Sequence, residues 1–95
     1  MNVFITGASS GLGAALANEF AKRGACLGLV ARRRDALDSI EAALPGTHHT
    51  YTVDITDKDA LIGAARAFDA TVGGADIVIA NAGISIGVKT EFYED

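Results

Sequence analysis

Close to its start, the chain contains the sequence Val3-Phe4-Ile5-Thr6-Gly7-Ala8-Ser9-Ser10-Gly11-Leu12-Gly13. Its first three residues are β-branched or aromatic and are typical of a buried strand. A glycine-rich turn follows, and the stretch from Ser10 to Arg23 repeats Leu12, Leu16 and Phe20 at a spacing of four. This spacing predicts a helix whose apolar stripe carries those three side chains. The segment therefore predicts a strand, a turn and a helix.

The same alternation of strand and helix continues to residue 80. The expected elements are a buried strand from Ala25 to Ala31, a helix from Asp35 to Leu44, an edge strand from Thr47 to Val53, a helix that starts at a capping box of Thr56 and Asp59 and ends at Gly73-Gly74, and a strand from Asp76 to Ala80. Alternation of this kind produces right-handed crossovers and a parallel sheet. We predict the first half of an α/β Rossmann-type doubly wound fold with strand order 3-2-1-4. Its ligand crevice would lie at the carboxyl ends of the first and fourth strands, where the winding reverses.

Composition restricts the class of protein. With 95 residues, of which 49% are hydrophobic, the chain can pack one core and form one domain. Its single cysteine excludes an internal disulfide and favours a reducing, cytoplasmic location. The apolar runs are far shorter than a membrane span, so we expect a soluble protein. The adjacent His48 and His49 would point to opposite faces of a strand, which disfavours a metal site.

Charge is unevenly distributed along the chain. The formal net charge is −4, which argues against a nucleic-acid-binding protein. Residues 1–34 nevertheless hold five basic groups against the single carboxylate of Glu19, whereas acidic groups dominate the remainder. A local basic cluster in an acidic protein suits one small polyanion, and a phosphorylated cofactor fits that description.

The glycines between the first strand and the first helix have the spacing Gly7-x-x-x-Gly11-x-Gly13. At this position, backbone N–H groups and the positive end of a helix can meet a pyrophosphate. Gly7 would allow a sharp turn, Gly11 a close approach of the phosphates and Gly13 a close contact between helix and sheet. The fingerprint G-x-G-x-x-G is not matched. The alternative is a glycine-rich turn that binds nothing.

The end of the second strand carries Arg32-Arg33-Arg34 where a carboxylate would bind the adenosine ribose of NAD(H). Guanidinium groups offer bidentate contacts to a 2′-phosphate, and a carboxylate would repel it. The pattern therefore favours NADP(H) over NAD(H). The alternative is that the arginines only begin a solvated helix, an interpretation that suits Arg34 better than Arg32.

Taken together, these residues resemble the short-chain dehydrogenase/reductase family. Thr6-Gly7-Ala8-Ser9-Ser10-Gly11-Leu12-Gly13 is similar to the glycine motif of that family, and Asn81-Ala82-Gly83 is similar to its second motif, after the fourth strand. The resemblance covers all 95 residues and implies that the chain is the N-terminal, cofactor-binding half of such an enzyme.

The resemblance also implies a set of cofactor-binding residues. Those that would line the diphosphate and the adenosine ribose are Gly7, Ser9, Ser10, Gly11, Leu12 and Gly13. Arg32, helped by Arg33, would hold the 2′-phosphate, and Asp54 with Ile55 would meet the adenine amino group. Asn81, Ala82 and Gly83 would pass the adenosine and ribose and brace the sheet. Asp54 also directly follows the third predicted strand, at the crevice, although it could be a loop-forming residue alone.

The catalytic Ser and Tyr-x-x-x-Lys of the family cannot be assigned in this sequence. We therefore expect residues 1–95 to be an NADP(H)-binding half-domain, truncated before the catalytic half and inactive alone. The complete enzyme would transfer hydride between NADP(H) and a carbonyl or alcohol substrate. The sequence does not determine the oligomeric state, and a homo-oligomer is one possibility.

Two alternatives remain at this stage. The first is a stand-alone NADP(H)-binding or regulatory module without catalysis. The second is a truncated chain that cannot fold, because the strand from Asp76 to Ala80 would leave an apolar edge unpaired.

Overall fold

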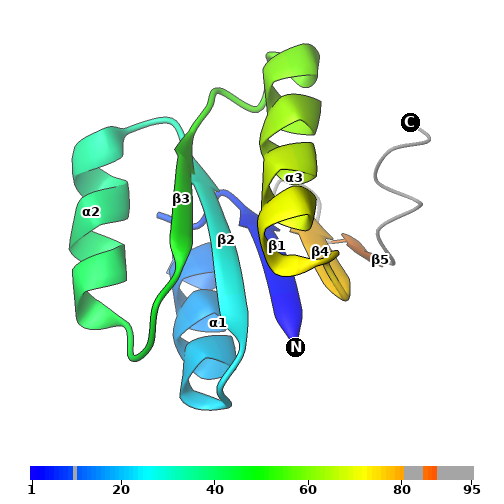
Figure 1. The fold of residues 1–95 in the computed structure, drawn as a ribbon. Helices are drawn as coiled ribbons and strands as arrows, with labels where there is room; N and C mark the ends of the chain where they lie inside the picture. Colours follow the sequence, from blue (N-terminus) through cyan, green and yellow to red (C-terminus); the bar gives the residue numbers. More distant parts are fainter. Residues whose placement is uncertain (10, 81–84, 88–95) are drawn as a thin grey trace.

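The computed structural model of the protein describes residues 1–9, 11–80 and 85–87 (Figure 1). The elements are β1 (Asn2–Thr6), α1 (Gly11–Lys22), β2 (Cys26–Ala31), α2 (Arg34–Ala43), β3 (His49–Thr52), α3 (Lys58–Val72), β4 (Ile77–Ala80) and β5 (Ser85–Gly87). They form one sheet in the order β3-β2-β1-β4-β5, in which the first four strands are parallel. The predicted order 3-2-1-4 and the doubly wound half-fold are therefore confirmed.

Helices cover both faces of the sheet (Figure 1). Val3 and Ile5 of β1 join a core cluster with side chains of α1 and α2, whereas Phe4 joins a second cluster with α3. Successive side chains of a strand point to opposite faces, so β1 supplies both cores. This two-sided burial explains why the central strands are continuously apolar in sequence.

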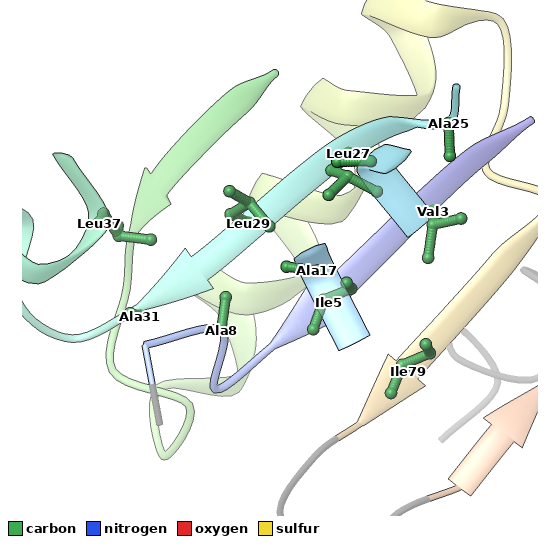
Figure 2. Packing of buried hydrophobic residues seen from close by; sticks show 11 residues of the cluster. Val3, Ile5, Ala8, Ala17, Ala25, Leu27, Leu29, Ala31, Leu37 and Ile79 are labelled. Carbon is green, nitrogen blue, oxygen red and sulfur yellow. The ribbon is translucent and has the colours of Figure 1, made fainter. Parts of the chain in front are cut away.

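The buried face of α1 differs from the predicted one. The structure buries Gly13, Ala17 and Ala21, whereas Leu12 is 50% exposed and Leu16 lies only partly buried beside the core. Figure 2 shows Ala17 among the strand side chains of this cluster. Small side chains allow the helix to lie close to the sheet, and the larger ones fit only at its flanks. A spacing of four therefore identified the helix but not its central stripe.

The start of α3 also differs from the prediction. Asp57 caps the helix, and its Oδ1 accepts a hydrogen bond from the Ala60 N–H at 3.2 Å. Thr56, the predicted capping residue, instead donates its backbone N–H and its hydroxyl to Asp54, at 3.0 Å and 2.8 Å. Because Asp54 engages Thr56, the next residue takes the capping position. The helix ends as expected at Gly73, which has a φ of +83°.

The free edge expected at β4 is paired in the structure. Residues 85–87 form β5, which runs antiparallel to β4 with Ile79 opposite Ile86. The prediction of an unpaired apolar edge is therefore wrong. An antiparallel partner can return after a short connection, whereas a parallel partner needs a long crossover, so β5 can pair so soon after β4.

His48 has a structural role that the sequence analysis missed. Its ring is buried, Nδ1 accepts the Leu27 N–H at 3.1 Å, and Nε2 lies 2.7 Å from the Pro45 carbonyl oxygen. The hydrogen therefore resides on Nε2, which donates to Pro45. Through these two bonds His48 joins the start of β2 to the turn that precedes β3.

Gly28 lies in β2 beside two aromatic rings of the second core cluster. The rings of Phe4 and Phe68 are in contact, with centroids 5.7 Å apart, and a Cβ on Gly28 would lie 2.8 Å from a ring carbon of each. Real Cβ atoms do not come so close to other carbons, so the two rings require a glycine here.

We expect Gly28→Ala to lower the free energy of unfolding by about 1–3 kcal/mol, because both rings must shift in a packed core. The control is Gly63→Ala on α3, where a Cβ meets nothing within 4 Å. That change should raise stability by up to about 1 kcal/mol through helix propensity alone. Urea denaturation of both variants measures the difference, and equal stabilities would contradict the packing argument.

Candidate dinucleotide-binding site

The predicted site residues gather at the carboxyl edge of the sheet. In the register of the parallel strands, Thr6 at the end of β1 pairs with Val30 of β2 and with Ala80 of β4, and Ala31 pairs with Thr52. The segments that follow these strands therefore leave from one edge. They contain the glycine loop, the arginine triplet and Asp54. Four predicted site residues lie outside the described residues, namely Ser10, Asn81, Ala82 and Gly83.

The loop after β1 is held to the sheet by backbone bonds. Gly7 has a φ of +66°, a conformation that favours glycine, and the chain turns sharply there. The Ala8 N–H then donates to the Val30 carbonyl at 3.0 Å, and the Ala8 side chain is fully buried. The turning role predicted for Gly7 agrees with this geometry.

Thr6 links the two strands between which the winding reverses. Its buried hydroxyl donates to the carbonyl of Ile79 in β4, at 3.4 Å. Thr6 belongs to the glycine motif in the sequence, but the motif alone predicts no role for it. A threonine at the last position of a strand, directly before the loop, was the signal that could have identified it.

Gly13 brings the first turn of α1 onto the loop backbone. A Cβ on Gly13 would overlap the carbonyl oxygen of Gly7, and it would lie 2.9 Å from the Gly7 carbonyl carbon and 3.2 Å from the Ala8 Cα. Only glycine allows this approach, and the close contact is with the loop backbone rather than with the sheet, where the sequence analysis placed it. The contact fixes the position of the loop relative to the helix that it precedes.

Gly11 differs from the other two glycines of the motif. It is the first residue of α1, it is exposed, and a Cβ built on it meets nothing within 4 Å in the described part of the chain. Its φ is also outside the left-handed region. Neither packing nor backbone conformation requires glycine here. The bare backbone leaves open an approach to the amino end of α1, where unpaired N–H groups favour anions.

The three arginines after β2 have different partners. Arg33 binds Asp35 through two contacts, Nε to Oδ1 at 3.3 Å and Nη2 to Oδ2 at 2.7 Å. Arg34 lies 3.8 Å from an Asp38 carboxylate oxygen, one turn further along α2. Arg32 is exposed and has no ion pair within residues 1–9, 11–80 and 85–87. Arg32 is therefore the arginine of the triplet that can most readily receive a ligand.

Asp54 occupies a turn at the same edge. The backbone N–H of Thr56, followed by its hydroxyl, lowers the pKa of the Asp54 carboxyl, and the charge of nearby Arg32 contributes in the same direction. Asp54 is therefore ionised at neutral pH, with its carboxylate oriented by Thr56. Ile55 beside it is 41% exposed. A carboxylate and an apolar side chain side by side can meet the amino edge and the face of a purine.

The described residues contain neither a metal-binding cluster nor a helix able to cross a membrane. Their His, Cys, Asp and Glu side chains include no group of three that could hold a metal ion. Of their helices, none combines the length and apolar character needed to cross a bilayer.

A cleft of about 360 Å³ opens near the amino ends of β2 and β3, between Lys22 and Pro45, and none of the predicted site residues lines it.

The family model described as short chain dehydrogenase matches residues 1–95. The chain belongs to the short-chain dehydrogenase family. An oxidoreductase of Mycobacterium bovis without an assigned reaction is 39% identical over 99 residues, covering 98% of this chain and 29% of that relative. The chain thus spans less than a third of the length of this relative.

Solved structures of short-chain dehydrogenases and reductases share the fold. L-sorbose reductase from Gluconobacter frateurii, complexed with NADPH and L-sorbose, is 33% identical and matches with a TM-score of 0.75 over 82% of this chain and 31% of its own. The 3-ketoacyl-(acyl-carrier-protein) reductase from Brucella melitensis, complexed with NADH, is 28% identical, with a TM-score of 0.75 over 82% of this chain and 32% of its own.

The geometry of the glycine loop can be tested directly by substitution. We expect Gly13→Ala to lower the free energy of unfolding by at least about 3 kcal/mol. An overpacked core usually costs about 1–3 kcal/mol, and here the new methyl group meets backbone atoms rather than a movable side chain. Gly11→Ala, with open space around the new methyl group, should leave stability within about 0.5 kcal/mol or raise it. Thermal and urea denaturation compare the stabilities of the two variants. An unchanged free energy of unfolding in Gly13→Ala would contradict the close contact.

Proposed function

We propose that residues 1–95 form the NADP(H)-binding half of a short-chain oxidoreductase that transfers hydride between NADP(H) and a carbonyl or alcohol substrate. The observation that carries this proposal is the contrast among the three glycines of the loop. The fold itself requires Gly7 and Gly13, but nothing in the described residues requires Gly11. A bare backbone at the start of a helix, held in place by two structural glycines, suits a diphosphate that must come close to N–H groups.

The residues available at this edge fit the parts of a dinucleotide. The diphosphate and adenosine ribose would contact the loop residues Gly7, Ser9, Ser10, Gly11, Leu12 and Gly13. Asp54 and Ile55 would receive the adenine, and Asn81, Ala82 and Gly83 would pass beside the adenosine and ribose. The bound cofactor would supply or accept the hydride. The residues of this chain bind it and orient it, and none of them is assigned to catalysis.

Arg32 supports NADP(H) as the preferred cofactor. It stands at the end of β2, where a carboxylate would favour NAD(H), and its exposed guanidinium can pair with a 2′-phosphate. The two similar reductases were solved one with NADPH and one with NADH, so their cofactors support either dinucleotide. The preference proposed here therefore rests on Arg32 and its surroundings.

We expect Arg32→Asp to weaken NADPH binding by about 10- to 100-fold, because a charge-assisted contact worth about 1.5–3 kcal/mol becomes a repulsion. NADH binding should change much less, since NADH has no 2′-phosphate. Lys22→Asp makes the same change of charge at the far end of α1 and should affect neither cofactor. Isothermal titration calorimetry of the unchanged protein and both variants measures the affinity of each for NADPH and for NADH. Equal losses for the two cofactors would contradict the assignment of Arg32 to the 2′-phosphate.

Gly11→Val should abolish the binding of both cofactors while the protein stays folded, because the side chain would fill the space that the phosphates need. The matched control is Gly63→Val, which places the same side chain at another open glycine, on α3. Circular dichroism verifies the fold of each variant, and fluorescence titration with NADPH measures binding. Unchanged affinity in a folded Gly11→Val variant would show that this loop is not the phosphate site.

A further inference from the structure

The basic cluster at the end of β2 is balanced by carboxylates in the folded protein. Arg33 binds Asp35, Arg34 lies near Asp38, and the charge of Arg32 lowers the pKa of Asp54, after the larger effect of the hydrogen bonds from Thr56. Three positive and three negative groups therefore meet at one edge. A phosphate that approaches this edge must compete with carboxylates already present, so its recognition depends on which arginine is released at the lowest cost.

The carboxylate of Asp35 contacts Arg33 in the way that a bound phosphate would. Both oxygens of the carboxylate are used, one at 3.3 Å from Nε and the other at 2.7 Å from Nη2 of the same guanidinium edge. A phosphate presents two oxygens to an arginine in the same bidentate manner. Arg33 directly follows Arg32 and forms the N-cap of α2 in an extended conformation.

We propose that Asp35 is a specificity-determining residue. Its carboxylate binds Arg33, competes with the 2′-phosphate of NADP(H) for that guanidinium, and so weakens the preference for this cofactor. This inference rests on the proposed function, because it concerns the same phosphate. The carboxylate of Asp35 and the 2′-phosphate compete for one guanidinium edge. A cofactor without the 2′-phosphate leaves the pair undisturbed, so Asp35 changes the affinity for NADPH and not for NADH.

The carboxylate of Asp35 is present in its charged form under ordinary conditions. The hydrogen bonds from Arg33 and then from the Ala36 backbone lower the pKa of Asp35. The side chains of Arg33 and Asp35 are 70% and 72% exposed, and exposed pairs of this kind are weak. The competition is therefore modest, and we expect an effect of a few-fold rather than a complete block.

Asp35→Asn is the direct test. The amide keeps the shape of the carboxylate and can still accept from the backbone at the start of α2, but it no longer carries the charge that holds Arg33. NADPH should bind about two- to fivefold more tightly to this variant, as the release of one exposed ion pair allows. NADH affinity should stay within the error of the measurement. Calorimetric titration with each cofactor at fixed salt gives both values.

Two controls separate the release of Arg33 from a general change in charge. Asp38→Asn removes the same charge one turn along α2, but its partner is Arg34 at 3.8 Å, so NADPH affinity should change less than in Asp35→Asn. In an Arg33→Gln background, Asp35→Asn should no longer increase the affinity for NADPH, because the released group is absent. The coupling between the two substitutions is the measured quantity.

Each other outcome overturns the proposal in a recognisable way. If Asp38→Asn raised the affinity for NADPH equally, or if the gain from Asp35→Asn persisted without Arg33, the cause would be the loss of a negative charge near the site and not the release of Arg33. A weaker binding of NADPH to Asp35→Asn would mean that Asp35 orients Arg33 toward the phosphate. Failure of the proposed function is distinct from these results, because the unchanged protein would then bind neither NADPH nor NADH.

Discussion

The contact between the first turn of α1 and the loop after β1 is the constraint on which the candidate site depends. A helix can approach this loop only because Gly13 has no side chain to meet the Gly7 carbonyl, and the approach continues along α1 through Ala17 and Ala21, which lie buried against the sheet. The bond from Ala8 to β2 holds the other side of the loop. The amino end of α1 is thereby fixed at the carboxyl edge, where an anion can reach it.

Around that fixed loop, charge is arranged in pairs rather than as a uniform basic surface. Arg33 and Arg34 have carboxylate partners on α2, whereas Arg32 stands beside the ionised Asp54 without a direct ion pair among the described residues. Such an arrangement gives little long-range attraction for polyanions in general, because the charges largely cancel beyond a Debye length. It suits the recognition of a single phosphate at close range, where geometry decides which guanidinium is used.

The topology could be predicted from the sequence because the alternation of apolar strands with helical spacing admits few arrangements. The turn at Gly7 could also be predicted, since the steric limits on a turn are local, whereas the close contact predicted for Gly13 is made with the loop backbone rather than with the sheet. Packing was predicted less well, because Leu12 has the right spacing but is too large for the central stripe of α1. Asp57 replaced Thr56 as the helix cap through a competing hydrogen bond, and the role of β5 as a partner of β4 depends on the whole sheet. These outcomes depend on competition between neighbours, which periodicity does not contain. The roles assigned to the site residues stay predictions.

A crystal structure of the protein grown with NADP⁺ would test the central claim most directly. The account predicts that the diphosphate lies against the backbone N–H groups of the loop between Gly7 and Gly13, close to Gly11, and that the 2′-phosphate contacts Arg32. A dinucleotide bound away from the carboxyl edge of the sheet, or one whose diphosphate lies far from Gly11, would contradict it.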